Sequence, residues 1–118
     1  INFVSSKISL QMINIDPPSG DYPASGGSST HYIVSESESR LAFKVKSSNN
    51  ESYRVRPVYG FVDAKGKAKL EVNRLAGPAK EDKLVIQYAE VPADETDPKA
   101  PFAAGAQQGE VVVKMVAS

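Results

Sequence analysis

The sequence predicts an all-β protein folded as an antiparallel β-sandwich. Three observations lead to this class. Apolar and polar residues alternate in short segments, clusters of Gly, Pro, Asn and Ser separate these segments, and no stretch has the 3.6-residue period of an amphipathic helix. The 118 residues are enough for one sandwich core and too few for two. We therefore expect a single all-β domain.

The first half of the chain contains four predicted strands, and the segment from Leu41 shows the clearest pattern. Leu41, Phe43 and Val45 are expected to face the core, and Ala42, Lys44 and Lys46 to face solvent. Pro17-Pro18 ends the first strand and confines it to a sheet edge, because proline cannot donate to a ladder. Residues 20–30 are rich in turn formers and are expected to let this edge strand cross between sheets. The four strands are expected at 13–15, 30–35, 41–46 and 53–57.

Three further strands are predicted in the second half. Leu84, Ile86 and Tyr88 are expected to point inward, and Lys83, Val85 and Gln87 outward. A glycine-punctuated bend at 58–66 precedes these strands, and 93–108 is expected to be a long loop with one helical turn. The three strands are expected at 67–72, 83–91 and 110–116. Seven short strands with turn signals between them are typical of an immunoglobulin-like, seven-stranded antiparallel β-sandwich.

Composition excludes several classes of function. Fourteen basic residues balance fourteen acidic ones, so no global field attracts nucleic acid or a membrane surface. The chain has no cysteine, which removes thiol catalysis and thiolate metal sites and favours a reducing, cytoplasmic setting. The apolar runs are only a few residues long, so no membrane span is expected, and the first residues lack the pattern of a signal peptide. We expect no cofactor.

The start of the chain has only a weak extended pattern. We expect residues 1–11 to be an N-terminal extension of uncertain origin, ahead of a domain at 12–118. Met12 is either a native initiator or an internal residue, and the pattern does not decide between the two.

Several motifs carry a resemblance to a known family. They are FKVKSS from Phe43, YRVRP from Tyr53, Gly60, and KLVIQ from Lys83, with Pro17-Pro18 near the start. With these motifs the chain resembles the major sperm protein domain, an immunoglobulin-like sandwich that also occurs in the VAMP-associated proteins of the endoplasmic reticulum. The longer motifs PASGGSSTH, RLAFKVKSSNN, PVYGFVD and RLAG-x-x-KEDKLVIQ are similar to those of small, single-domain sperm proteins of nematodes.

A basic sheet face is the main candidate for binding. In an immunoglobulin topology the strands at 41–46 and 83–91 lie side by side, so their outward lysines surround Val85 and are edged by the turn after residue 46. Lysine is a flexible point charge that attracts carboxylates, and an extended acidic peptide could add main-chain hydrogen bonds at the sheet edge. The resemblance implies that such a face binds acidic peptides containing two phenylalanines. The peptide-binding candidates are Lys44, Lys46, Ser47, Ser48, Lys83 and Val85.

Two considerations weigh against this site. The family often has methionine where this chain has Val85, and threonines where it has Ser47 and Ser48, so the pocket here is expected to be shallower. Lysines also occur on solvent faces for solubility and to guard sheets against edge pairing. A solvated face with no ligand is therefore the competing interpretation.

No residue pattern predicts catalysis or a metal site. His31 is expected to lie in a strand with its ring at the surface, without a nucleophile beside it. The acidic cluster of Asp94, Glu95 and Asp97 lacks the spacing of a calcium loop and is expected to be solvated. Pro57 is expected to be structural, because it fixes the backbone where the chain leaves the sheet. We therefore expect a non-enzymatic protein.

Two functions are left open by the sequence. The resemblance implies a structural or protein–protein interaction module of the sperm cytoskeleton and motility machinery, which acts by binding partners or by self-association, for example as a homodimer. The alternative is an adaptor that binds acidic, phenylalanine-containing peptides on the lysine face.

Overall fold

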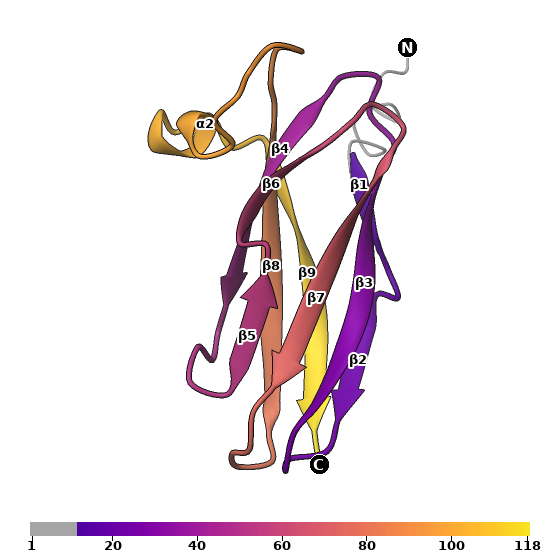
Figure 1. The fold of residues 1–118 in the computed structure, drawn as a ribbon, viewed down its shortest axis with the longest axis vertical. Helices are drawn as coiled ribbons and strands as arrows, with labels where there is room; N and C mark the ends of the chain where they lie inside the picture. The colour runs from indigo at the N-terminus through magenta and orange to yellow at the C-terminus, as the bar shows by residue number, and fades with distance from the viewer. Residues whose placement is uncertain (1–11) are drawn as a thin grey trace, which may run out of the picture.

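The protein is a sandwich of two β-sheets, seen in a computed structural model that describes residues 12–118 (Figure 1). The expected extension at 1–11 lies outside the described residues. A four-stranded sheet has the order β1-β3-β7-β5, and a five-stranded sheet has the order β2-β9-β8-β4-β6. The strands are β1 (Ile13–Asp16), β2 (Ser19–Tyr22), β3 (Gly27–Ser35), β4 (Leu41–Ser47), β5 (Tyr53–Arg56), β6 (Tyr59–Val62), β7 (Lys67–Arg74), β8 (Glu81–Glu90) and β9 (Gly109–Ala117).

The predicted fold class is confirmed, and each of the seven predicted strands is present. Two short strands were not predicted. β2 (SGDY) contains no β-branched residue, and β6 (YGFV) lies in the segment that was expected to be a bend. β2 pairs with β9 in parallel, whereas the other pairings between the described strands are antiparallel. The sandwich is therefore not purely antiparallel.

Two of the crossings between sheets occur at prolines. β1 belongs to the four-stranded sheet and β2 to the five-stranded sheet, and Pro17-Pro18 lies between them. The stretch at 20–30, which was expected to carry a crossing, contains the next one, since residues 23–26 lead from β2 back to β3 of the four-stranded sheet. In the same way, Pro57 lies between β5 and β6, which belong to different sheets. Prolines suit both places, since a backbone leaving a ladder needs no N–H donor there.

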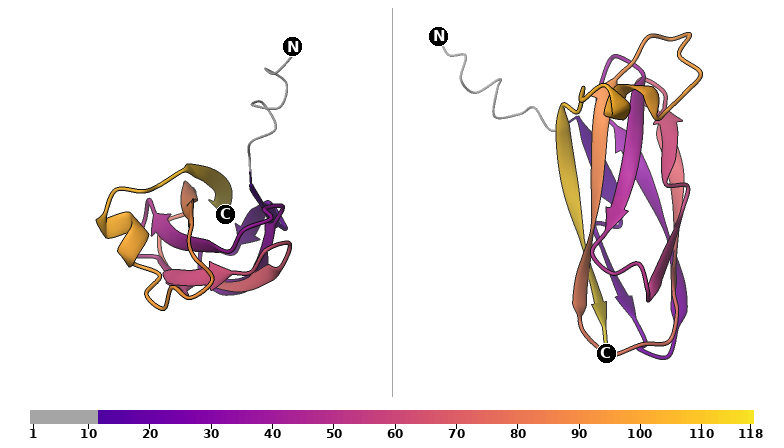
Figure 2. Two further views of the ribbon diagram at one scale, coloured as in Figure 1. Left: turned by 90° about the horizontal axis from the view of Figure 1, so that it is seen from above. Right: turned by 90° about the vertical axis from the view of Figure 1, so that its left-hand side faces the viewer.

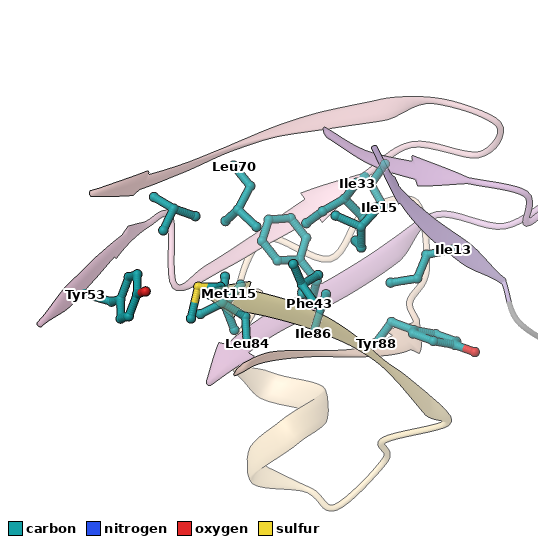
Figure 3. Packing of buried hydrophobic residues seen from close by; sticks show 14 of the residues in the cluster. Ile13, Ile15, Ile33, Phe43, Tyr53, Leu70, Leu84, Ile86, Tyr88 and Met115 are labelled. Atoms are coloured by element: carbon teal, nitrogen blue, oxygen red, sulfur yellow. The ribbon is translucent and has the colours of Figure 1, made fainter. Parts of the chain in front are cut away.

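The core fills the space between the sheets with the inward side chains of the alternating strands (Figure 3). Phe43 and Ile86 from the five-stranded sheet meet Ile33 and Leu70 from the four-stranded sheet, and all four are at most 1% exposed. The predicted alternation in β4 is therefore confirmed on its inner face. Burial of this apolar surface stabilises the fold by roughly 25 cal/mol per Å² removed from water.

The prediction that His31 has its ring at the surface is wrong. The side chain is 1% exposed, because β3 alternation places His31 on the same inner face as Ile33. Its Nδ1 lies 2.7 Å from the carbonyl oxygen of Pro17, and its Nε2 lies 2.8 Å from Ser29 Oγ. A carbonyl only accepts, so Nδ1 carries the proton and, in the neutral ring, Nε2 accepts from the serine hydroxyl. The ring thus ties the β1–β2 crossover to β3.

A long loop at 91–108 projects from one end of the sandwich, opposite the C terminus (Figures 1 and 2). It contains the single helical turn that was predicted, α2 (Ala100–Ala103). The loop returns to the sheet where the Gln108 N–H donates to the Tyr88 carbonyl and the Gln108 Oε1 accepts from the Glu90 N–H. It is therefore anchored at its C-terminal end before β9 begins.

Candidate basic protein-binding face

β4 and β8 are neighbours, so the outward residues of the two strands lie together. Lys46 is directly opposite Val85, and the Ser48 N–H donates to the Lys83 carbonyl at 3.0 Å. Directly opposed residues share a face of the sheet, and diagonal neighbours are about 7–8 Å apart. Lys46, Lys83 and Val85 therefore form one cluster on the outer face of the five-stranded sheet.

The neighbouring strand β9 extends this cluster with two residues that were not predicted. Val112 is opposite Val85, and Lys114 is opposite Lys83. Val112 is 52% exposed, the highest value among the large apolar residues at 12–118. The run EVVVKMV hides the alternation because valine occupies inward and outward positions alike. We define the basic face as Lys46, Lys83, Val85, Val112 and Lys114.

The part of the same sheet surface around Tyr59 is in contact with the long loop. The Phe102 ring of the loop lies 6.1 Å from the Tyr59 ring, and Tyr59 is opposite Lys44. The Lys44 ammonium lies 5.6 Å from the centre of the Tyr59 ring, and Lys44 is partly buried. Ala42 and Gln87, which were predicted to face solvent, are buried. Alternation indicates which side of the strand a residue is on, but not whether that side is open to solvent.

The two predicted serine ligands are engaged in the turn itself. Ser48 Oγ donates to Asp82 Oδ1 and accepts from the Lys83 N–H, both at 3.0 Å. Ser47 Oγ accepts from the Asn49 N–H at 3.1 Å. The Asn49 amide donates to the other Asp82 carboxylate oxygen at 3.2 Å. These hydroxyl groups hold the β4–β5 turn against β8, so their first role is to shape the edge of the basic face.

An open hollow of about 610 Å³ lies beside the basic face, between β4 and β5. β6 pairs with β4 as far as Lys44, and the Val45 N–H donates to the Val58 carbonyl, so only the last residues of β4 after Val45 have no strand partner on this side. Val58, 46% exposed, contributes apolar surface, and Lys46 borders both the hollow and the basic face. The residues that line it are Val45, Lys46, Ser47, Asn50, Tyr53, Arg54, Val55 and Val58. A shallow pocket was expected at Val85, but the hollow lies on the opposite side of β4 and Val85 does not line it.

The electrostatics of the basic face are positive. Within the described part of the chain, Lys46 and Lys83 form no ion pair. Lys114 Nζ lies 3.6 Å from Glu81 Oε1, but both side chains are more than half exposed and such pairs contribute little. The Asp82 carboxylate is 5% exposed and is held by the turn. Lysine ammonium groups are therefore what a partner meets here.

The described residues form neither a metal site nor a membrane-spanning helix. No group of three or more His, Asp or Glu side chains at positions 12–118 is placed to hold a metal ion. Asp94 and Asp97 of the acidic cluster are exposed, as predicted for a solvated loop. No helix within 12–118 is long and apolar enough to cross a membrane.

Comparisons with known proteins agree with this geometry. A family model of the MSP (major sperm protein) domain matches residues 12–111. Sperm-specific class P protein 34 of Caenorhabditis elegans is 78% identical, over 91% of this chain and 100% of its own length. Sperm-specific class P protein 32 of the same organism is 71% identical, over 86% of this chain and 95% of its own length.

Solved structures with the same fold include a member of this family. The structure of WR4, a C. elegans MSP family member, superposes with a TM-score of 0.89 at 78% identity and covers 91% of this chain and 98% of that one. The PapD-like domain 7 of human CEP192 matches with a TM-score of 0.59 at 8% identity, covering 91% of this chain and 85% of that one. The second likeness indicates a shared fold alone.

Proposed function

This chain belongs to the major sperm protein domain family, and we propose that it acts as a non-catalytic, structural or protein–protein interaction module of the sperm cytoskeleton and motility machinery. Its relatives named as sperm-specific place it among sperm proteins. A cytoplasmic location, association with the cytoskeleton and the capacity to self-associate are parts of the proposal.

One observation carries the interaction role. The basic face combines three lysines with two valines on the outer side of the five-stranded sheet, and Val112 among them is 52% exposed. Uncovered apolar residues surrounded by like charges are typical of a surface that a partner covers. The partner is expected to bring acidic groups, because Lys46 and Lys83 form no ion pair within the described residues.

Fractionation of sperm from the source nematode tests the cytoskeletal role. We expect the protein to sediment with the detergent-resistant cytoskeleton, and a Lys46→Glu/Lys83→Glu variant to move to the soluble fraction. A matched variant, Lys67→Glu/Lys69→Glu, makes the same charge change on β7 of the other sheet and should sediment like the parent. Recovery of the parent in the soluble fraction alone would contradict the proposal.

The alternative function is an adaptor that captures acidic, phenylalanine-containing peptides. The hollow between β4 and β5 favours it, because an aromatic side chain can enter there while carboxylates meet Lys46 and Lys83. The unpaired end of β4 also offers main-chain groups to an added strand. Because the hollow lies beside the basic face, one extended peptide can contact the hollow and the basic face together.

Fluorescence anisotropy with a labelled acidic peptide tests the adaptor role. The probe is a peptide with three carboxylates followed by two phenylalanines, and its control replaces both phenylalanines by alanine. We expect saturable binding by the parent, weaker binding of the control peptide, and loss of binding in Lys46→Glu/Lys83→Glu. Absence of binding by the parent at low ionic strength would exclude this role.

A further inference from the structure

The loop at 91–108 carries the acidic counterpart of the basic face. Asp94 and Asp97 are exposed and Glu95 is partly exposed. No ion pair involves these three carboxylates within residues 12–118. The net charge of the chain is zero, yet the described structure separates its signs, with unpaired lysines on one surface and unpaired carboxylates on another. Such separation favours contact between unlike surfaces.

The acidic loop is held in place. The Arg40 guanidinium donates to the carbonyls of Glu95 at 2.7 Å and Ala93 at 3.2 Å. The same guanidinium lies 3.8 Å from the centre of the Phe61 ring, which fixes it on β6. Arg40 forms its ion pair with Asp63, at 3.7 Å, and none with the three loop carboxylates. A loop ordered in advance loses little conformational entropy on binding.

The acidic loop cannot reach the basic face of its own chain. Lys83 lies near the start of β8, and the loop leaves β8 after its last residue, Glu90. Seven residues of extended strand separate these points by roughly 23 Å. Figure 1 shows the start of β8 and the loop with α2 at opposite ends of the sandwich. The two charged surfaces are thus available only to different molecules.

We propose that the acidic loop of one copy docks on the basic face of a second copy, with Asp94 and Asp97 against Lys46 and Lys83. This deepens the proposed function, on which it rests, by naming a second copy of the chain as an occupant of the basic face. The contact joins two different surfaces, so it is heterologous, and repetition generates open chains or rings rather than a symmetric dimer.

The physical character of the contact follows from its exposed charges. Exposed ion pairs are individually weak and are screened over about 8 Å at physiological ionic strength. Association is therefore expected to need high protein concentration and to decrease steeply with added salt. A contact of this strength suits an assembly that forms and dissolves with local concentration.

Sedimentation velocity on four proteins tests the proposal. They are the parent, the loop variant Asp94→Lys/Asp97→Lys, the face variant Lys46→Glu/Lys83→Glu, and the control Lys67→Glu/Lys69→Glu. At low ionic strength the parent and the control should gain weight-average mass as concentration rises, and 0.5 M NaCl should reverse this gain. The loop variant and the face variant should each remain monomeric alone, because in each of them the loop and the basic-face position carry charges of the same sign.

Mixing the two reversed variants gives the decisive result. The positive loop of one variant then meets the negative face of the other, and the negative loop of the second meets the positive face of the first, so a 1:1 mixture should associate. A parent that stays monomeric at every concentration, or reversed variants that associate like the parent, would overturn the proposal. A monomeric parent that still binds the acidic peptide would reject loop docking and retain the adaptor. A monomeric parent that binds no peptide would reject both loop docking and the adaptor function.

Discussion

The hydroxyl of Ser48 donates a hydrogen bond to the Asp82 carboxylate at 3.0 Å and accepts another from the Lys83 N–H. The resemblance to peptide-binding relatives suggested Ser48 as a ligand, whereas its contacts join the β4–β5 turn to β8. The carboxylate is almost completely buried and accepts a second bond from Asn49. Ser48 is therefore placed to keep Lys46 and Lys83 at a fixed separation.

Replacing Ser48 by alanine should lower stability more than it affects binding directly. Ser48→Ala leaves Asp82 Oδ1 and the Lys83 N–H without their partner, and we expect a loss of about 1–3 kcal/mol in the free energy of unfolding. Urea denaturation measures this loss. Ser47→Ala is the matched control and should lose less, because its hydroxyl accepts a single bond from the Asn49 N–H. Equal losses for the two variants would contradict the role given to Ser48.

The stability of the protein should fall in alkaline solution through Tyr22. Burial raises the pKa of Tyr22 above its usual 10.0, with the hydrogen bond between Tyr22 and Ser29 acting in the opposite direction. The unfolded chain therefore ionises first, and the stabilisation present below pH 10 is lost as pH rises toward the folded pKa. Tyr22→Phe should have a shallower decline in the free energy of unfolding between pH 9 and 11, measured by urea denaturation. A decline as steep as that of the parent would contradict this assignment.

The buried ring of His31 should contribute strongly to stability. His31→Leu keeps the volume apolar but leaves the Pro17 carbonyl and the Ser29 hydroxyl without the ring, and we expect a loss of about 1–3 kcal/mol. Ser29→Ala breaks only one of the two bonds to the ring and should cost less. Thermal unfolding followed by circular dichroism compares the two variants. An unchanged melting temperature for His31→Leu would mean that the crossover does not depend on the ring.

Pro57 should stabilise the fold without affecting the basic face. It lies between β5 and β6, and Pro57→Ser frees a backbone angle there in the unfolded chain. We expect a loss of about 0.4–1 kcal/mol in the free energy of unfolding, with the affinity for the acidic peptide unchanged. Unfolding and anisotropy titrations on the same preparations test both expectations. An unchanged stability would remove the structural role, and a loss of peptide binding would show that Pro57 also shapes the hollow.

The alternation of side chains predicted which way each strand faces, but not what covers that face. Lys44 and Lys46 have the same orientation in β4, yet only Lys46 remains open to solvent. The difference arises from Phe102, which is more than forty residues away in sequence and packs against Tyr59. Long loops carry no periodic signal, so their packing cannot be predicted from periodicity.

The β9 residues of the basic face and the burial of His31 were not predicted from the sequence, for different physical reasons. Val112 and Lys114 lie in a strand whose valines occupy both faces, so no alternation marked them. The surface position given to His31 followed the usual exposure of polar side chains, although the same alternation that placed Ile33 inward applied to His31 as well. A buried histidine is acceptable only where both ring nitrogens find partners. One partner is Ser29 of β3, and the other is the carbonyl of Pro17 between β1 and β2, which no sequence pattern links to His31.

NMR on the ¹⁵N-labelled protein during titration with the acidic, phenylalanine-containing peptide tests most directly whether the basic face binds a protein partner. We expect amide shifts to change progressively on β4, β8 and β9 at Lys46, Lys83, Val85, Val112 and Lys114, and at the hollow around Val58. Outer-face residues of the other sheet, such as Tyr32 and Lys69, should remain unchanged. Shifts confined to that other sheet, or no shifts at saturating peptide, would contradict the assignment of the basic face as a protein-binding surface.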